Sequence, residues 1–113
     1  MPHCIIEYSS DIEVSIGLDT LLNTVHDAAI NSGLFSVDDI KTRALPFTQR
    51  QTILACDSFI HVSLHILSGR TIKQRKALST LMVAALNTLA LESISMSASV
   101  VELERESYTK IIK

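Results

Sequence analysis

One pattern limits the fold of this chain more than any other feature: the order strand, helix, strand occurs twice, over residues 1–47 and again over residues 58–104. The spacing of apolar residues predicts strands at 2–8, 39–47, 58–67 and 95–104, and helices at 16–32 and 71–91. Because the crossover between parallel strands is right-handed, both helices can lie on one face of one sheet. The sequence therefore predicts an α+β fold with a four-stranded sheet, in a single domain over residues 1–113 that ends in a tail at 105–113.

Local signals mark where the elements end. Gly33 follows the first helix where a glycine commonly ends one, because glycine adopts a left-handed backbone without strain. Thr71 and Gln74 have the spacing of a capping box, so the second helix is expected to begin there. Pro46, near the end of the strand at 39–47, indicates either an edge strand or the last paired residue. The predicted buried stripe of the second helix consists of Leu78, Leu81, Met82, Ala85, Leu86 and Leu89.

The third predicted strand has two unlike faces. Ile60, Val62, Leu64 and Ile66 alternate along it with Phe59, His61, Ser63 and His65. We expect the aliphatic set to meet the helices. The other set is too polar for a core and too neutral for a solvent face, and the fourth strand repeats it with Ser95, Ser97 and Ser99. The chain is 19% charged, against about 25% in ordinary soluble domains. We therefore expect this second face to be buried against other copies of the chain.

Composition excludes several classes of protein. Ten Lys and Arg against twelve Asp and Glu give a net charge of −2, which provides no basic field for nucleic acid. The longest unbroken apolar run, Leu81–Leu86, is too short to span a membrane, and the N-terminus lacks the basic region of a secretory signal. Cys4 and Cys56 are too few for a disulfide framework and lack the spacing of a metal site. We expect a cytoplasmic protein with free thiols and with neither nucleic-acid nor membrane partners.

Pro2 is the first candidate for chemistry. Removal of Met1 would leave a secondary amine at the chain terminus, and an unperturbed α-amino group titrates at about 7.7–8.0. A general base works best with a pKa near the working pH, so this amine would need little adjustment. Equally, a proline at position 2 can do no more than permit excision of the methionine. With Met1 attached, the Pro2 nitrogen is a tertiary amide and cannot act as a base.

Three cations could bind an anion. Arg70 lies in the junction Ser68-Gly69-Arg70-Thr71, where unpaired N–H groups and the positive end of a helix dipole suit a carboxylate or phosphate. Lys41 and Arg43 lie two apart in a strand, hence on one face about 7 Å apart. Each of the three could instead be an ordinary solvated side chain. We interpret a further basic residue, Arg105, as part of a solvated strand end together with Glu102, Glu104 and Glu106.

The order of these segments resembles a known family. The resemblance rests on the start Met1–Ser9, on Ser32–Phe35 leading to Ile40–Arg43, and on His61–Leu64 followed by Gly69–Thr71 and by Gln74 and Arg75. Over most of the chain these are similar to 5-carboxymethyl-2-hydroxymuconate delta-isomerase, a family of the tautomerase superfamily. The similarity is thinnest at 48–58 and after Leu91.

The resemblance implies a homotrimer in which each sheet contributes to a central barrel with the helices outside. It implies an isomerase that ketonises an unsaturated 2-hydroxy di- or tricarboxylate in homoprotocatechuate breakdown, without a metal or organic cofactor. Carried over by position, Pro2 is the catalytic base, Arg70 is catalytic and binds substrate, and Lys41 and Arg43 bind the small anionic carboxylate substrate. The alternatives are a trimeric interaction module without this activity, or a relative that uses the proline for another reaction such as decarboxylation.

Overall fold

A computed structural model describes residues 1–53 and 56–113, with helices and strands in the predicted order. The strands are β1 (His3–Ser9), β2 (Lys41–Phe47), β3 (Ser58–Leu67) and β4 (Ile94–Leu103). The helices are α1 (Leu18–Asn31) and α2 (Ile72–Asn87), and short 3-10 turns occupy η1 (Ser10–Val14), η2 (Val37–Asp39) and η4 (Arg105–Ser107). The predicted loop at 48–57 includes residues 54 and 55, which lie outside the described residues.

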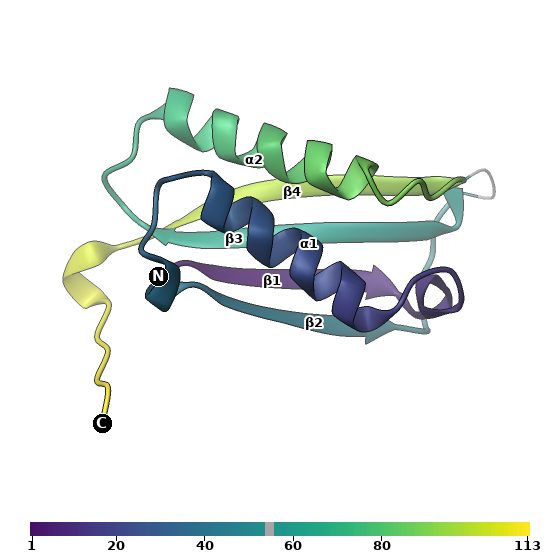
Figure 1. Ribbon diagram of the computed structural model, residues 1–113, viewed down its shortest axis with the longest axis horizontal. Coiled ribbons are helices and arrows are strands. Elements are labelled where there is room, and N and C mark those ends of the chain that lie inside the picture. The colour runs from purple at the N-terminus through teal and green to yellow at the C-terminus, as the bar shows by residue number, and fades with distance from the viewer. Residues whose placement is uncertain (54–55) are drawn as a thin grey trace.

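The four strands form one mixed sheet in the order β2-β1-β3-β4. The outer pairs, β1 with β2 and β3 with β4, are parallel, as two β-α-β units require, while the central pair of β1 and β3 is antiparallel. Both helices lie on the same face of the sheet (Figure 1). This confirms the predicted α+β fold, and β2, which carries Pro46, is an edge strand, the first of the two alternatives for this proline.

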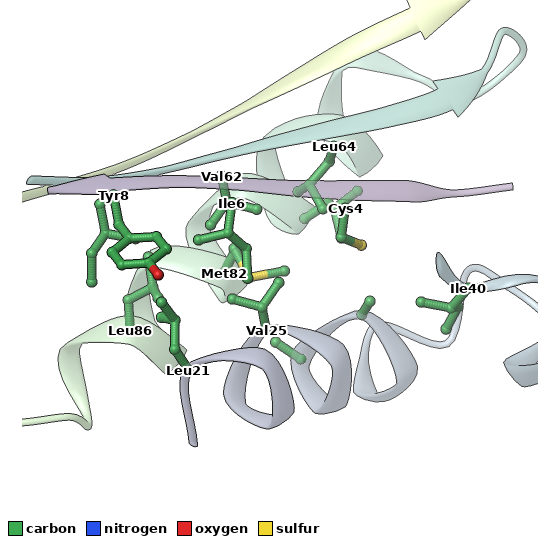
Figure 2. Packing of buried hydrophobic residues seen from close by; sticks show 14 of the residues in the cluster. Cys4, Ile6, Tyr8, Leu21, Val25, Ile40, Val62, Leu64, Met82 and Leu86 are labelled. Carbon is green, nitrogen blue, oxygen red and sulfur yellow. The ribbon is translucent and has the colours of Figure 1, made fainter. Parts of the chain in front are cut away.

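The core lies between the sheet and the two helices (Figure 2). Alternate residues of the central strands supply one side of it, namely Cys4, Ile6, Tyr8, Ile60, Val62, Leu64 and Ile66, each at most 1% exposed. Helix α2 contributes Leu78, Met82 and Leu86, whereas Ala85 and Leu89 of the predicted stripe pack on it only partly buried. Burying a side chain of this size stabilises the fold by about 1.5–3 kcal/mol, so this alternation holds the sheet in register.

Capping interactions fix where α2 begins. The Thr71 hydroxyl accepts a hydrogen bond from the Gln74 backbone N–H at 3.1 Å, and the Gln74 side chain accepts one from the Thr71 N–H at 2.9 Å. The predicted capping box is thus confirmed, and it uses two backbone N–H groups at the start of the helix, those of Thr71 and Gln74. At the end of α1, Gly33 has a φ of 71°, the left-handed conformation predicted for it.

The second face of the sheet carries neutral polar groups on β3 and β4, a few apolar groups, and the charged residues Glu7, Lys41 and Arg43 on β1 and β2. His61 contacts serine hydroxyls of β4 with both ring nitrogens, Nδ1 to Ser97 at 2.7 Å and Nε2 to Ser99 at 3.1 Å. Leu45 of β2 lies on the same face and is 53% exposed. Within the described residues, no helix covers this face (Figure 1), which is the arrangement expected of a surface that other copies cover.

The two ends of the sheet differ. At the end where β3 begins, Arg50 bridges two carboxylates, with Nη2 at 2.9 Å from Asp11 and 3.3 Å from Asp57, and Asp11 also accepts a hydrogen bond from the Ser58 hydroxyl. At the other end, β1 and β2 begin, and both chain termini lie there (Figure 1). No helix of the described chain has the length and apolarity to cross a bilayer.

Candidate active site

A pocket of about 210 Å³ opens at the end of the sheet where the chain begins. Its walls come from the N-terminus, the α1–β2 connection, the end of β3, the β3–α2 turn and η4. The lining residues are Met1, Leu34, Phe35, Ser36, Asp39, Ile66, Leu67, Arg70 and Arg105. Two guanidinium groups and one carboxylate therefore stand in an otherwise largely apolar wall, a composition suited to an anionic small molecule.

Pro2 lies directly beside this pocket. Its side chain is fully buried, and its carbonyl accepts a hydrogen bond of 3.1 Å from the backbone N–H of Lys41, which fixes the start of β1 against β2. Met1, bonded to the Pro2 nitrogen, is itself part of the pocket wall. Excision of Met1 would therefore leave the proline nitrogen at the edge of the pocket.

The terminal amine of this chain has a pKa lowered from its ordinary value. Burial is the main cause, because it penalises the charged ammonium; the positive charges of Lys110 and Lys41 act in the same direction, and Asp39 opposes them. A lowered pKa leaves more of an amine unprotonated near neutral pH. The surroundings at this end of the sheet thus favour a base.

Arg70 reaches the pocket from the turn between β3 and α2. Gly69 has a φ of 123°, a conformation that residues with a Cβ rarely adopt, and it sends the chain back across the end of the sheet. The Arg70 guanidinium lies over the Phe35 ring, with Cζ 5.7 Å from the ring centroid, and donates a hydrogen bond to the Leu34 carbonyl. It is held by these contacts from the opposite wall, and the described residues give it no carboxylate partner in an ion pair.

Lys41 and Arg43 lie outside the pocket within one chain. Both are exposed on the second face of the sheet, where register places them beside His3 and Ile5 of β1. The Lys41 ammonium donates to the carbonyl of Asp39 at 3.3 Å, and the Arg43 guanidinium lies 3.1 Å from His3 Nδ1. The structure thus places Arg70 and Met1, the residue before Pro2, in the walls of one pocket but directs the other two predicted cations to the open face.

Three residues of this region were not singled out as site residues by sequence reasoning. Arg105, interpreted as part of a solvated strand end, is exposed, yet its guanidinium donates to the Ser68 carbonyl at 3.1 Å and lines the pocket. Asp39 lines it too and forms an ion pair of 3.2 Å with Lys110. The C-terminal residues have no periodic pattern that would indicate where they fold, so only the tertiary structure reveals their place.

Comparison with known proteins identifies similar sequences and folds. A family model described as 5-carboxymethyl-2-hydroxymuconate isomerase matches residues 2–110. Among curated proteins, none matches the sequence. A solved 5-carboxymethyl-2-hydroxymuconate isomerase from Deinococcus radiodurans R1 is similar at a TM-score of 0.79 and 20% identity, covering 99% of this chain and 90% of that one.

Two further solved structures share the fold. A 5-carboxymethyl-2-hydroxymuconate delta-isomerase has a TM-score of 0.80 at 15% identity, over 100% of this chain and 89% of that one. The malonate semialdehyde decarboxylase FG41, inhibited by 3-bromopropiolate, has a TM-score of 0.72 at 12% identity, over 96% and 88%. At these identities the likeness establishes the shared fold.

Proposed function

The chain belongs to the 5-carboxymethyl-2-hydroxymuconate isomerase family and is an isomerase of the tautomerase type; from this premise we propose that it ketonises an unsaturated 2-hydroxy di- or tricarboxylate such as 5-carboxymethyl-2-hydroxymuconate. The observation that carries this proposal is the position of the buried Pro2 beside a pocket lined by Arg70 and Arg105. The reaction would belong to the bacterial breakdown of homoprotocatechuate, and it needs no metal or organic cofactor.

Proton transfer by a single base accounts for the chemistry. With Met1 removed, the Pro2 nitrogen takes the proton of the 2-hydroxyl group, and the electrons of the O–H bond form the C2 carbonyl. The conjugated double bond shifts, and the same proton is returned to a carbon farther along the chain. Substrate and product are isomers, so no oxidant or reductant is needed. The pKa of a terminal amine is lowered at this end of the sheet, chiefly by burial, which favours the free base.

Arg70 has two roles in this proposal. Its planar guanidinium can bind a substrate carboxylate through two parallel hydrogen bonds, and its positive charge stabilises the dienolate that forms when the hydroxyl proton leaves. The contact with the Phe35 ring orients the group before substrate arrives. Because this charge interacts more strongly with the dienolate than with the ground state, loss of Arg70 should lower kcat as well as raise KM.

Assembly decides the contribution of the remaining cations. We propose that the chain forms a trimer through the second face of the sheet, where His61 and its serine partners offer hydrogen-bonding groups without net charge. Lys41 and Arg43 lie on that face. Their binding of a substrate carboxylate therefore depends on the trimer, whereas the contact of Arg70 is available within one chain.

The test begins with the intact mass of the protein from its natural cell, which must show Met1 absent. Purified protein should then remove the dienol absorbance of 2-hydroxymuconate. We expect Pro2→Ala and Arg70→Ala each to lower kcat/KM at least about 100-fold, in the range of general-base and electrostatic contributions. Lys73→Ala, which removes an exposed charge from α2 away from the pocket, serves as the matched control. Quantitative retention of Met1, or full activity of either variant, would contradict the mechanism.

A second candidate reaction is decarboxylation by the same proline, favoured by the shared fold with a malonate semialdehyde decarboxylase. The two reactions differ in their products. Isomerisation gives a product of the same mass as its substrate, whereas decarboxylation releases carbon dioxide. Mass spectrometry of the product, with a 2-hydroxymuconate and a 3-oxo acid as parallel substrates, separates them.

A further inference from the structure

The C-terminal tail is attached to the pocket end of the sheet by contacts with several elements. After β4, η4 turns the chain across this end, and the tail passes the N-terminus (Figure 1). The Arg105 backbone N–H and guanidinium donate to the side chain and carbonyl of Ser68 at 3.4 and 3.1 Å. Farther along, the Tyr108 hydroxyl lies 3.4 Å from His3 Nε2, and Lys110 pairs with Asp39 at 3.2 Å. The tail therefore contacts the pocket end of the sheet through Arg105, Tyr108 and Lys110.

The Tyr108 contact has a defined hydrogen-bond direction. Arginine can only donate, so the contact of Arg43 with His3 Nδ1 at 3.1 Å makes that nitrogen the acceptor. The ring hydrogen of neutral His3 is then on Nε2 and is donated to the Tyr108 hydroxyl. The pKa of His3 is lowered, mainly by burial and next by Arg43, which keeps the ring neutral. Tyr108 thus holds the tail against the residue that directly follows Pro2.

The Lys110 contact bears on the charge of the pocket. Asp39 is the one carboxylate among the residues that line it. A bare carboxylate there would repel an anionic substrate and would stabilise the protonated form of a nearby amine. Lys110 places a positive charge against this carboxylate, and its hydrogen bond is the main cause of the lowered pKa of Asp39. The charged and titratable groups that surround the terminal amine are Lys110, Asp39, Lys41, His3, Arg70 and Arg105.

We propose that Lys110 is a positioning residue of the active site: it pairs with Asp39 and so keeps the base at Pro2 and the incoming carboxylate free of an uncompensated negative charge. This rests on the proposed function, because it needs Met1 removed and an anionic substrate. The pair is partly exposed, with side-chain exposures of 32% and 41%, so it contributes little to stability. Substitution of Lys110 should therefore leave the fold intact and change the electrostatics alone.

The sign of the effect follows from the two charges. Removing Lys110 alone leaves Asp39 facing the amine, which raises the pKa of Pro2 and moves the acidic limb of the kcat/KM profile to higher pH. We expect a shift of about half a pH unit, the scale of a unit charge several ångströms away near a protein surface. Removing Asp39 alone moves the limb to lower pH. Removing both returns it toward its original position.

The experiment titrates the Pro2 nitrogen directly by NMR in protein labelled with 15N proline, and records the pH profile of kcat/KM in parallel. The variants are Lys110→Gln, Lys110→Arg, Asp39→Asn and the Asp39→Asn/Lys110→Gln pair. Lys113→Gln, in the same tail and exposed, is the matched control. We expect Lys110→Gln to raise the amine pKa and the KM, Lys110→Arg to restore both, and Lys113→Gln to change neither.

An amine that titrates identically in Lys110→Gln and in the unaltered protein would overturn this proposal. So would a Lys113→Gln shift as large as that of Lys110→Gln, because the effect would then belong to tail charge in general. The direct titration does not depend on turnover. If the protein is inactive but the pKa of its terminal amine still changes in Lys110→Gln, the proposed reaction is contradicted, whereas the effect of Lys110 on the amine is confirmed.

Discussion

The capping box at the start of α2 allows a quantitative prediction for Thr71→Ala. The Thr71 hydroxyl accepts from the Gln74 N–H at 3.1 Å and lies 3.3 Å from the Gln74 side-chain oxygen, to which it can donate. The reciprocal bond, from the Thr71 N–H to that oxygen at 2.9 Å, involves the backbone and survives the substitution. Alanine therefore removes one half of the box and leaves an exposed N–H that water can reach.

The magnitude follows from this partial loss. N-cap replacements of this kind lower the free energy of unfolding by about 1 kcal/mol, within a range of about 0.5–2. The loss should stay below the upper end of this range, because water can form a hydrogen bond with the exposed N–H group. About 1 kcal/mol lowers the folding equilibrium constant roughly fivefold. For a domain of this length it lowers Tm by about 4 °C. Thr71→Ser, which keeps the hydroxyl, should retain most of the stability.

The assay is urea unfolding at one fixed protein concentration, because the proposed assembly would make stability depend on concentration. The midpoint should fall while the slope m stays unchanged. Thr80→Ala makes the same substitution at an exposed position inside α2, where alanine is the better helix former, so its midpoint should stay or rise. Equal midpoints for Thr71→Ala and Thr80→Ala would refute the reasoning.

The remaining predictions concern the core, the acid limit and the open face. Met82→Ala, at a site with no exposure, should lower the free energy of unfolding by about 2–5 kcal/mol in the same urea assay; a loss below 1 kcal/mol would show that the site collapses around the smaller side chain. The hydrogen bond from the Ser58 hydroxyl, with other hydrogen bonds, holds the pKa of Asp11 below its ordinary value. The ionised carboxylate therefore stabilises the fold at pH values above the pKa that Asp11 has in the unfolded chain. This stabilisation is lost as the pH falls through the lower pKa of the folded protein. Asp11→Asn should therefore make the urea midpoint depend less steeply on pH on the acid side. An unaltered pH dependence there would show that Asp11 does not contribute to it. Ser63→Asp puts a charge on the open face and should reduce the molecular mass measured by light scattering; an unchanged mass would place the interface elsewhere.

The fold was largely predictable because its information is local. Alternation in β3 located the strand at 58–67, and the structure agrees. It also assigned four residues to the core that are buried there, namely Ile60, Val62, Leu64 and Ile66. The end of α2 was placed too late, at 91 rather than 87. Leu89 and Leu91 keep the apolar spacing and pack against the core, but the helix has already ended, and Ala90 takes a positive φ of 55°. Apolar residues thus stay in contact with the core beyond the last helical hydrogen bond. Apolar periodicity predicts the contact with the core, but it does not show where the helix ends.

The pocket was only partly predictable, for a related reason. Pro2 and Arg70 carry local signals, a terminal position and a strand-to-helix turn. Asp39, Arg105 and Lys110 meet only because the tail returns across the end of the sheet. Lys41 and Arg43 were correctly expected to share one strand face, but only the register of β2 against β1 shows which face it is.

The antiparallel centre of the sheet has a consequence for stoichiometry. Two like β-α-β halves joined in this way give the molecule two ends of similar backbone, with β1 starting at one and β3 at the other. A polypeptide has a single first residue, so only one of these ends can supply a terminal nitrogen. The other is closed by Arg50 between Asp11 and Asp57. After removal of Met1, an alkylating reagent directed at the Pro2 amine should accordingly saturate at one equivalent per chain, because the proposed base can occur at only one end of the duplicated fold.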